Sequence, residues 1–551
     1  MTRSISFGKT LPPFGSAIAL SGALLFALSG AEARIAKTPS VTIAIDATAN
    51  LHPIDPRIYG VAWGSSADLA ALNVPLNRMG GNAMTDYNWA LNAQNLAADW
   101  YFESYPEQSA VPGEEADTFV SNSKAASAEP MLTVPLLGWV ANLGNNRTIL
   151  PSFSVAKYGP QCATDPYFSD AGDGIETDCN TFITGNDPYD SYVKDSPALE
   201  QKWIKHLVKT WGKSGQGGVK YYLMDNEASI WFSTHRDAHP KGPHAIEYRD
   251  KVLAESAKIK TLDPNALVVA PEEWGWDGYF YSGFDQQYAA HHGYKRYPDH
   301  TKEQNGMDYI PWLLNQWKAA GHPVDVVSVH FYPQGGEFSD DVSEQMQLLR
   351  NRSTRQLWDP NYVSESWINQ PVYLIPRMKG WIADDYWSGT PAALTEYNWG
   401  AEGYINGATT QADIDGILGQ QGLDMATRWT VPDSSTPTYK AMQMYRNYDG
   451  AGSAFGDTSI LASAPNPDNL SAFAALRSTD NAMTVMVISK VLSGNTGVTL
   501  TLAHFTPSGT AKVYQLTSSN VIQKLSDVSW SGGVLNDTEP AQSITLYILP
   551  K

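Results

Sequence analysis

Two distant stretches of this sequence each end a short apolar run on a glutamate. The first is Tyr221-Tyr222-Leu223-Met224-Asp225-Asn226-Glu227-Ala228, and the second is Ala392-Ala393-Leu394-Thr395-Glu396-Tyr397-Asn398-Trp399-Gly400. A (β/α)8 barrel builds its active site from carboxylates delivered at the C-terminal ends of its strands. Two such carboxylates are typical of glycoside hydrolysis. The two stretches therefore predict a barrel with two catalytic carboxylates at its mouth.

The rest of the chain supplies the remaining strands and helices. Runs that resemble strands lie at 58–63, 75–79, 131–137, 219–224, 267–270, 324–331, 392–396 and around 428–430, and helical patterns lie at 199–211, 247–261, 310–320 and 412–426. Alternation of strands and helices indicates a parallel sheet, and eight such units close a barrel. Glu227 and Glu396 then end the fourth and the seventh strand. The long connections at 82–130 and 138–195 predict cleft walls.

The pattern changes after a helix predicted at 439–448. Short strands with turn signals follow at 470–476, 482–491, 497–502, 511–516 and 543–549. This predicts an all-β sandwich, to which an early strand at 41–45 also pairs. We therefore expect an α/β fold, a (β/α)8 TIM-like barrel with a C-terminal all-β sandwich domain. The expected divisions are 1–33, 34–57 with the early strand, 58–450 for the barrel and 451–551 for the sandwich.

The first 33 residues have the pattern of a secretory signal. Arg3 and Lys9 precede a small, apolar stretch at 14–30, and Ala31-Glu32-Ala33 fits the cleavage rule. The mature chain is expected to begin at Arg34 and to be secreted or periplasmic. The alternative is an uncleaved anchor helix, for which the apolar run is near the lower length limit. We expect no membrane association after cleavage.

Composition limits the partners. The chain carries 38 Lys and Arg against 57 Asp and Glu, a net charge of −19, and no basic face that would bind nucleic acid. Its 18 Trp and 28 Tyr suit a polysaccharide substrate, because sugar rings stack on aromatic faces. The acidic balance disfavours polyanionic substrates such as pectin and tolerates neutral polysaccharides, and we expect a monomer.

The two cysteines and an acidic stretch raise the question of disulfides and metals. Cys162 and Cys179 are predicted to pair in an oxidising compartment and to pin a long insertion, the alternative being two free thiols. The stretch at 170–174 is either a solvated acidic loop or a structural calcium site. No cofactor is required.

Several polar residues at predicted strand ends are candidates for the site. Arg78 would place a cation near the carboxylates, and Asn82 would reach a sugar hydroxyl, although the glycines between them also fit an ordinary turn. His330 and Tyr332 end a buried strand and would hold a carboxylate in its ionised form, whereas the structural alternative is a core histidine. Asn226 would bond the sugar 2-hydroxyl. The tryptophans at or after strand ends, some of them expected in the core, are Trp63, Trp89, Trp139, Trp231, Trp276 and Trp399.

These motifs together resemble glycoside hydrolase family 44, endo-acting β-1,4-glucanases and xyloglucanases with a barrel and a β-sandwich. The matching pieces are Arg78-Met79-Gly80-Gly81-Asn82, Thr85 to Trp89, Tyr222 to Trp231, Pro271 to Trp276, His330-Phe331-Tyr332-Pro333, Thr395-Glu396-Tyr397, Met425 to Trp429, Met442 to Gly450 and Phe455-Gly456-Asp457. The resemblance implies a retaining mechanism with Glu227 as acid/base and Glu396 as nucleophile. One departure is Ala228, where the family usually has proline, which would fix φ in that turn.

The resulting hypothesis is a secreted endo-β-1,4-glucanase that hydrolyses carboxymethyl cellulose, xyloglucan or lichenan. A mannanase or xylanase on the same barrel is the second hypothesis, because pocket shape around C2 and C6 decides the substrate. A non-catalytic carbohydrate-binding protein is the third, and the paired glutamates argue against it.

Overall fold

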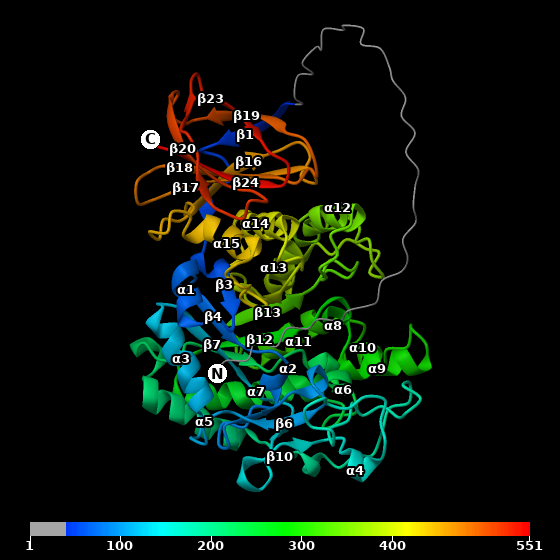
Figure 1. The fold of residues 1–551 in the computed structure, drawn as a ribbon. Coiled ribbons are helices and arrows are strands. Elements are labelled where there is room, and N and C mark those ends of the chain that lie inside the picture. Colours follow the sequence, from blue (N-terminus) through cyan, green and yellow to red (C-terminus); the bar gives the residue numbers. More distant parts are fainter. Residues whose placement is uncertain (1–39) are drawn as a thin grey trace, which may run out of the picture. The chain divides into compact units, whose positions relative to one another are not determined.

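Eight strands close into a barrel in the computed structural model, which describes residues 40–551 (Figure 1). Their order around the barrel is β11 (Tyr221–Met224), β12 (Leu267–Glu273), β13 (Val326–Phe331), β14 (Ala392–Tyr397), β15 (Met425–Arg428), β3 (Gly60–Ala62), β4 (Leu76–Met79) and β7 (Glu129–Val134). Neighbouring strands are parallel, so all their carboxyl ends meet at one mouth. The predicted barrel is confirmed, with β11 fourth and β14 seventh among its strands along the chain.

A helix follows each barrel strand along the chain. These helices are α1 (Ser66–Leu72), α3 (Glu114–Ala125), α5 (Pro197–Trp211), α7 (Ala245–Leu262), α11 (Tyr309–Ala319), α13 (Leu374–Asp385), α14 (Ile405–Gln420) and α15 (Pro437–Arg446). In α5 the Ser196 hydroxyl accepts a bond from the Leu199 amide, and Pro197 occupies the first turn. One stripe of α5, including Trp203 and Leu207, is buried.

Alternating side chains of the strands fill two separate layers. Tyr221 and Leu223 of β11 lie in the core cluster inside the barrel, whereas Tyr222 and Met224 pack with the surrounding helices. A strand that is buried on both faces reads as a continuous apolar run. This explains why the barrel strands are visible in the sequence.

The two long connections carry secondary structure of their own. The first contains α2 (Asn82–Thr85), β5 (Ala93–Asn95), β6 (Glu103–Pro106) and α3, and the second contains β8 (Trp139–Ala141), β9 (Leu150–Pro151), α4 (Val155–Tyr158) and β10 (Tyr192–Lys194). Strand β6 pairs with both β5 and β9, and thereby joins the two connections. Cys162 and Cys179 form the predicted disulfide in the second connection.

The C-terminal β domain is a single mixed sheet whose strands surround a core. Its members are β1 (Ser40–Asp46), β2 (His52–Pro53), β16 (Thr458–Ser463), β17 (Leu470–Leu476), β18 (Met483–Ser489), β19 (Thr496–Ala503), β20 (Gly509–Leu516), β21 (Gln523–Lys524), β22 (Val528–Trp530), β23 (Val534–Glu539) and β24 (Ser543–Leu549). The early strand β1 lies between β16 and β19, antiparallel to the first and parallel to the second. Apolar residues from both halves of the sheet, among them Ile43, Val485 and Leu500, form one core.

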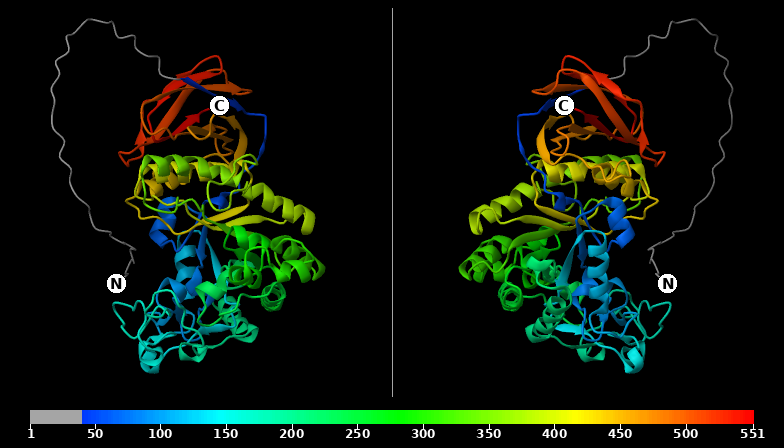
Figure 2. Two further views of the ribbon diagram at one scale, coloured as in Figure 1. Left: turned by 90° about the vertical axis from the view of Figure 1, so that its right-hand side faces the viewer. Right: turned by 90° about the vertical axis from the view of Figure 1, so that its left-hand side faces the viewer.

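The other face of this sheet packs on the barrel helices. Phe473 of β17 and Met486 of β18 belong to the same core cluster as the helices α14 and α15. A Cβ atom on Gly416 of α14 would lie 2.2 Å from the Phe473 ring, so this glycine permits close packing. Figure 2 shows the yellow helices between the orange and red strands and the rest of the barrel. Residues 39–551 form one compact unit.

Three predicted elements have different limits in the structure. The run at 58–63 forms a strand only over Gly60–Ala62, because Pro56–Tyr59 is a 3-10 helix capped by Asp55. The last barrel strand is Met425–Arg428 rather than 428–430, since its pairing with β14 begins at Met425. The helix predicted at 412–426 is α14 at Ile405–Gln420, so the prediction merged the end of a helix with the following strand.

Residues 1–33 of the predicted signal lie outside the described part of the chain. Within residues 40–551, no helix is both long enough and apolar enough to span a bilayer.

Candidate active site

The mouth of the barrel brings together carboxylates from three strands. Glu227 follows β11, Glu272 and Glu273 end β12, and Glu396 lies near the end of β14. Glu227, Glu272 and the nearby Asp225 adopt positive φ angles of 49°, 57° and 69°. Such angles are uncommon for residues other than glycine and recur at functional sites. The backbone around the ends of β11 and β12 is therefore unusually constrained at these acidic residues.

Glu396 is held by two donors. Its Oε2 accepts a bond of 2.7 Å from Arg78 Nη1, and its Oε1 accepts one of 2.8 Å from the Tyr332 hydroxyl. The two bonds fix the orientation of this carboxylate from both of its oxygens. Arg78 is fully buried at the end of β4, where the charges of Glu396 and Glu272 outweigh the opposing effect of burial and raise its pKa.

Glu227 faces Glu396 across the mouth. One carboxylate oxygen of Glu227 lies within 4.8 Å of one of Glu396. Glu227 Oε1 lies 2.9 Å from His330 Nδ1. Burial raises the pKa of Glu227, the bond and charge of His330 lower it, the charge of Glu396 raises it further, and the net direction is upward. Glu227 is therefore suited to carry a proton.

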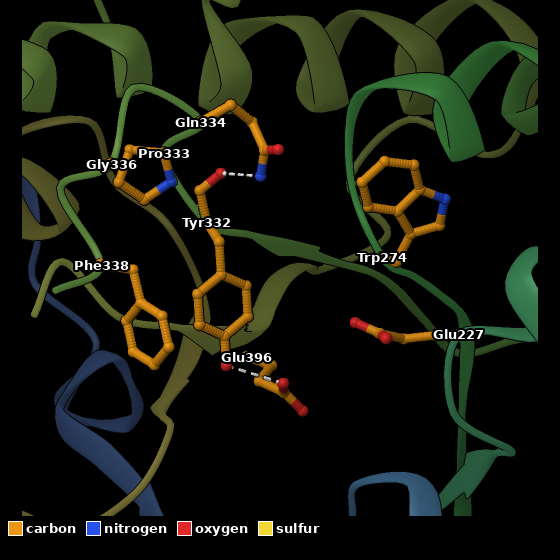
Figure 3. A pocket seen from close by; sticks show the side chains of 8 residues that line it. All are labelled: Glu227, Trp274, Tyr332, Pro333, Gln334, Gly336, Phe338 and Glu396. Carbon is orange, nitrogen blue, oxygen red and sulfur yellow. Dashed lines mark hydrogen bonds between the residues drawn. The ribbon is translucent and has the colours of Figure 1, made fainter. Parts of the chain in front are cut away.

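A cavity of about 490 Å³ lies over the two glutamates. Its lining consists of Glu227, Trp274, Tyr332, Pro333, Gln334, Gly336, Phe338 and Glu396. Figure 3 shows Trp274 above Glu227 on one side and Tyr332 with Phe338 on the other. Aromatic walls with carboxylates between them fit a sugar ring, whose faces are apolar and whose rim is polar.

Asn226 joins Arg78 to Asn82 beside the pair. Its Oδ1 accepts a bond of 2.9 Å from Arg78 Nη2, and its Nδ2 donates one of 3.2 Å to Asn82 Oδ1. Asn82 in turn donates to Asp99. The predicted residues Arg78, Asn82 and Asn226 thus form one network with the catalytic candidates.

Comparisons with known proteins agree on one family. The sequence model of glycoside hydrolase family 44 matches residues 93–335. The crystal structure of CelM2, a bifunctional glucanase-xylanase protein from a metagenome library, is 58% identical, has a TM-score of 0.91, and covers 93% of this chain and 100% of that one. The chain belongs to glycoside hydrolase family 44. A family 44 xyloglucanase from Paenibacillus polymyxa is 26% identical over 93% of this chain and 99% of its own, with a TM-score of 0.77.

A longer curated protein also matches. Beta-mannanase/endoglucanase A of Caldicellulosiruptor saccharolyticus is 29% identical over 480 residues, which is 80% of this chain. The chain spans only 33% of the length of that relative.

The six predicted tryptophans do not line the cavity of this family 44 chain. Trp231, Trp276 and Trp399 are buried, with exposed fractions of 0%, 7% and 3%. Trp63 donates to the Gly80 carbonyl, and Trp89 donates to the Leu199 carbonyl. Trp139 stacks under the Lys194 ammonium group. A position after a strand end does not determine whether a side chain faces the mouth or the helix layer.

Sequence reasoning missed three residues of this region. Trp274 and Phe338 line the cavity, and Glu272 lies buried beneath it. The strand at 267–270 was expected to end before Pro271, but β12 continues to Glu273. The signal for Glu272 was its place directly after an apolar run, as for Glu227.

Two groups of residues 40–551 have ligand atoms spaced as a cation would require. They are Glu227 with His330 and Glu396, and His244 with Asp299 and Glu303. In the first, Arg78 and His330 already bond the carboxylates. In the acidic stretch at 170–174, the carboxylate of Asp170 accepts bonds from Ser154 and the Ala156 amide, and that of Asp173 accepts from the Ile175 amide.

Proposed function

We propose that this chain is a retaining endo-β-1,4-glucanase with Glu227 as acid/base and Glu396 as nucleophile. The observation that carries the proposal is the separation of the two carboxylates, whose nearest oxygens lie within 4.8 Å. Retaining glycosidases place the groups about 5–5.5 Å apart, whereas inverting enzymes leave about 6.5–9.5 Å for a water molecule.

The geometry assigns a step to each residue. Glu396, held by Arg78 and Tyr332, attacks the anomeric carbon as a carboxylate while Glu227 protonates the leaving oxygen. Glu227 then removes a proton from water, which attacks the same carbon and releases Glu396. Asn226 lies beside the pair, where its amide would bond the sugar 2-hydroxyl. The residues supply this chemistry without a cofactor.

The proposed substrates are soluble glucans with internal β-1,4 bonds, namely carboxymethyl cellulose, xyloglucan and lichenan. The names of the relatives support this, since they include a glucanase-xylanase, a xyloglucanase and an endoglucanase. Xylan and mannan are the second candidates, because two of those names also include xylanase and mannanase activities.

A reducing-sugar assay on these five polysaccharides tests the proposal. We expect the wild type to hydrolyse the glucans fastest, and Glu227→Gln and Glu396→Gln to lower kcat/KM by about 10²-fold or more. Glu129→Gln is the matched control, because this exposed glutamate begins β7 at the opposite end of the barrel. Full activity of both active-site variants would contradict the mechanism, and a binding protein would show no turnover at all.

We also propose that the enzyme is a secreted monomer that begins at Arg34. The signal pattern of residues 1–33 and the Cys162–Cys179 disulfide, a bond typical of oxidising compartments, support secretion. Amino-terminal sequencing of the protein from the culture medium and its sedimentation mass test both points. A protein that stays in the cell pellet with its first 33 residues attached would contradict secretion, and the mass of a dimer would contradict the monomer.

A further inference from the structure

A third carboxylate lies beneath the catalytic pair, and the mechanism above does not use it. Glu272 is fully buried and does not line the cavity. Its Oε2 lies 3.1 Å from His330 Nε2 and 3.3 Å from Arg78 Nη2, and its Oε1 accepts a bond of 2.9 Å from the Thr395 hydroxyl. Glu272 therefore contacts the groups that hold both catalytic glutamates without reaching the sugar itself.

His330 connects this carboxylate to the acid/base. Its Nδ1 lies 2.9 Å from Glu227 Oε1, and its Nε2 lies 3.1 Å from Glu272 Oε2. A neutral imidazole has one N–H, whereas the imidazolium has two and can donate to both carboxyl groups. If instead Glu227 donated its proton to Nδ1, that proton would point away from the glycosidic oxygen. Burial raises the pKa of Glu272, but the bond to His330 and the charge of Arg78 outweigh it and lower that pKa, so Glu272 accepts at this contact. With Glu272 as acceptor, both contacts are made, and Glu227 keeps its proton for the substrate, when His330 is charged.

The buried cluster around the catalytic pair is electrically neutral if His330 is charged. Before reaction, the cations of Arg78 and His330 match the anions of Glu272 and Glu396, and Glu227 is protonated. After the first step, Glu396 is an uncharged ester and Glu227 is an anion, so the two cations again match two anions. An unpaired buried charge is strongly unfavourable. A permanently charged His330 keeps the cluster neutral through both states.

We propose that Glu272 is a positioning residue that holds His330 as a permanent imidazolium, which orients Glu227 and stabilises its carboxylate between the two steps. This rests on the proposed function. In the first step the glycosidic C–O bond breaks, Glu396 bonds to the anomeric carbon, and the proton of Glu227 passes to the leaving oxygen. In the second, water bonds to that carbon, its proton passes to Glu227, and the bond to Glu396 breaks. Glu272 and His330 exchange no proton in either step.

The other groups around His330 agree with this role. Burial lowers the pKa of His330, but the charge of Glu396 and the bonds to Glu227 and Glu272 raise it to about 9. The further groups that face it are the Arg78 cation, the Tyr332 hydroxyl on Glu396, the Tyr279 hydroxyl on the His330 carbonyl, and Glu273. Burial raises the pKa of Glu273 to about 8, so that neighbour is neutral over the acidic and neutral range.

The pH profile of kcat/KM tests the proposal, because its basic limb reports loss of the proton of Glu227 in the free enzyme. In Glu272→Gln, His330 loses a carboxylate that keeps it charged, so 15N NMR of its imidazole should show deprotonation at a pH lower by about 1 to 3 units than in the wild type. Removing a positive charge in His330→Gln should move the basic limb of the profile to higher pH by a similar amount. The double variant loses one charge of each sign, so its limb should return toward the wild-type position.

Glu273→Gln is the matched control, since it replaces a neighbouring buried glutamate that is already neutral. Its limb and the deprotonation of its His330 should stay at the wild-type pH. A purely structural role of Glu272 would lower kcat/KM without moving the deprotonation of His330, and that result would overturn the proposal, as would an equal shift of the His330 deprotonation in Glu273→Gln.

If Glu272→Gln alone does not fold, the other two variants decide. A raised limb in His330→Gln that returns in the double variant supports the proposal, and an unmoved limb in His330→Gln contradicts it. The substrate assays of Glu227→Gln and Glu396→Gln are carried out first, because they test the proposed function on which the role of Glu272 rests. Inactivity of these two, with an unmoved His330 deprotonation in Glu272→Gln and an unmoved limb in His330→Gln, would refute only the role of Glu272.

Discussion

Arg78 is the residue at which the charges of the site converge. Its guanidinium donates to Glu396 and Asn226 and lies 3.3 Å from Glu272. Gly80 makes room for it, since a Cβ there would lie 2.5 Å from the guanidinium carbon, whereas Gly81 makes room for the Trp429 ring, 2.4 Å from where its Cβ would lie. The planar fork of arginine lets one side chain serve several acceptors. Arg78 thus holds Glu396, the proposed nucleophile, and Asn226, the amide beside Glu227, in one geometry.

Arg78→Lys should lower kcat/KM by about 10²- to 10³-fold. A lysine ammonium can pair with Glu396 but cannot also hold Asn226, because it lacks the fork. Steady-state kinetics and the melting temperature measure the effect. Arg57→Lys is the control, an arginine paired with Asp55 in a partly exposed position. Wild-type kinetics in Arg78→Lys would contradict this prediction, because they would show that activity does not require the Arg78–Asn226 hydrogen bond.

A strand could be recognised from the sequence only where its own residues show that it is buried. The runs that became β11 and β14 were recognisable because both faces of each strand are apolar up to the final polar residues. Strand β12 was cut short at Ala270, since two consecutive glutamates normally indicate solvent. They are buried here because Arg78 and His330 supply partners for Glu272 and the Ser229 hydroxyl donates to Glu273. Those partners come from elsewhere in the chain, so no local pattern reveals them.

A buried ion pair joins two such elements, α14 and the segment after β18. Lys490 Nζ lies 2.8 Å from Asp413 Oδ2, and both side chains are nearly inaccessible. Lys490→Met leaves the carboxylate of Asp413 buried without its cation, which should lower the free energy of unfolding by about 3–5 kcal/mol. The control is Lys512→Met, which replaces an exposed lysine of β20. It should change the free energy of unfolding by less than about 0.5 kcal/mol. Urea denaturation compares the two, and equal stabilities would contradict the importance of this pair.

The whole molecule joins the barrel and the β domain through shared packing. The order of the barrel strands was predictable because each strand is followed by its helix. The position of β1 between β16 and β19 was not, since it pairs residues more than 400 positions apart in the sequence. The same close packing buries several ionisable groups across both parts, and these groups make stability depend on pH.

Melting temperature should fall as pH rises from about 5 to about 9. Burial raises the pKa of Glu273 to about 8 and those of Asp415 and Glu539 to about 7, so the folded chain keeps protons that the unfolded chain releases near pH 4. Burial lowers the pKa of His235, but the charge of Asp86 raises it to about 9, and its contribution is complete below about pH 6.5 and lost as pH rises through 9. Both effects have the same sign. Calorimetry across this range checks the trend, and Glu539→Gln should flatten it. A rising melting temperature would be incompatible with these buried protons.

The central claim is that Glu396 forms a covalent bond to the sugar. The most direct measurement is to incubate the enzyme with a 2-deoxy-2-fluoro-β-cellobioside that carries a good leaving group, and to map the labelled peptide by mass spectrometry. The fluorine slows the release of a glycosyl-enzyme, so a retaining enzyme accumulates it. We predict one label per chain, on Glu396. A label on another side chain, or a burst of product without any adduct, would contradict the assignment.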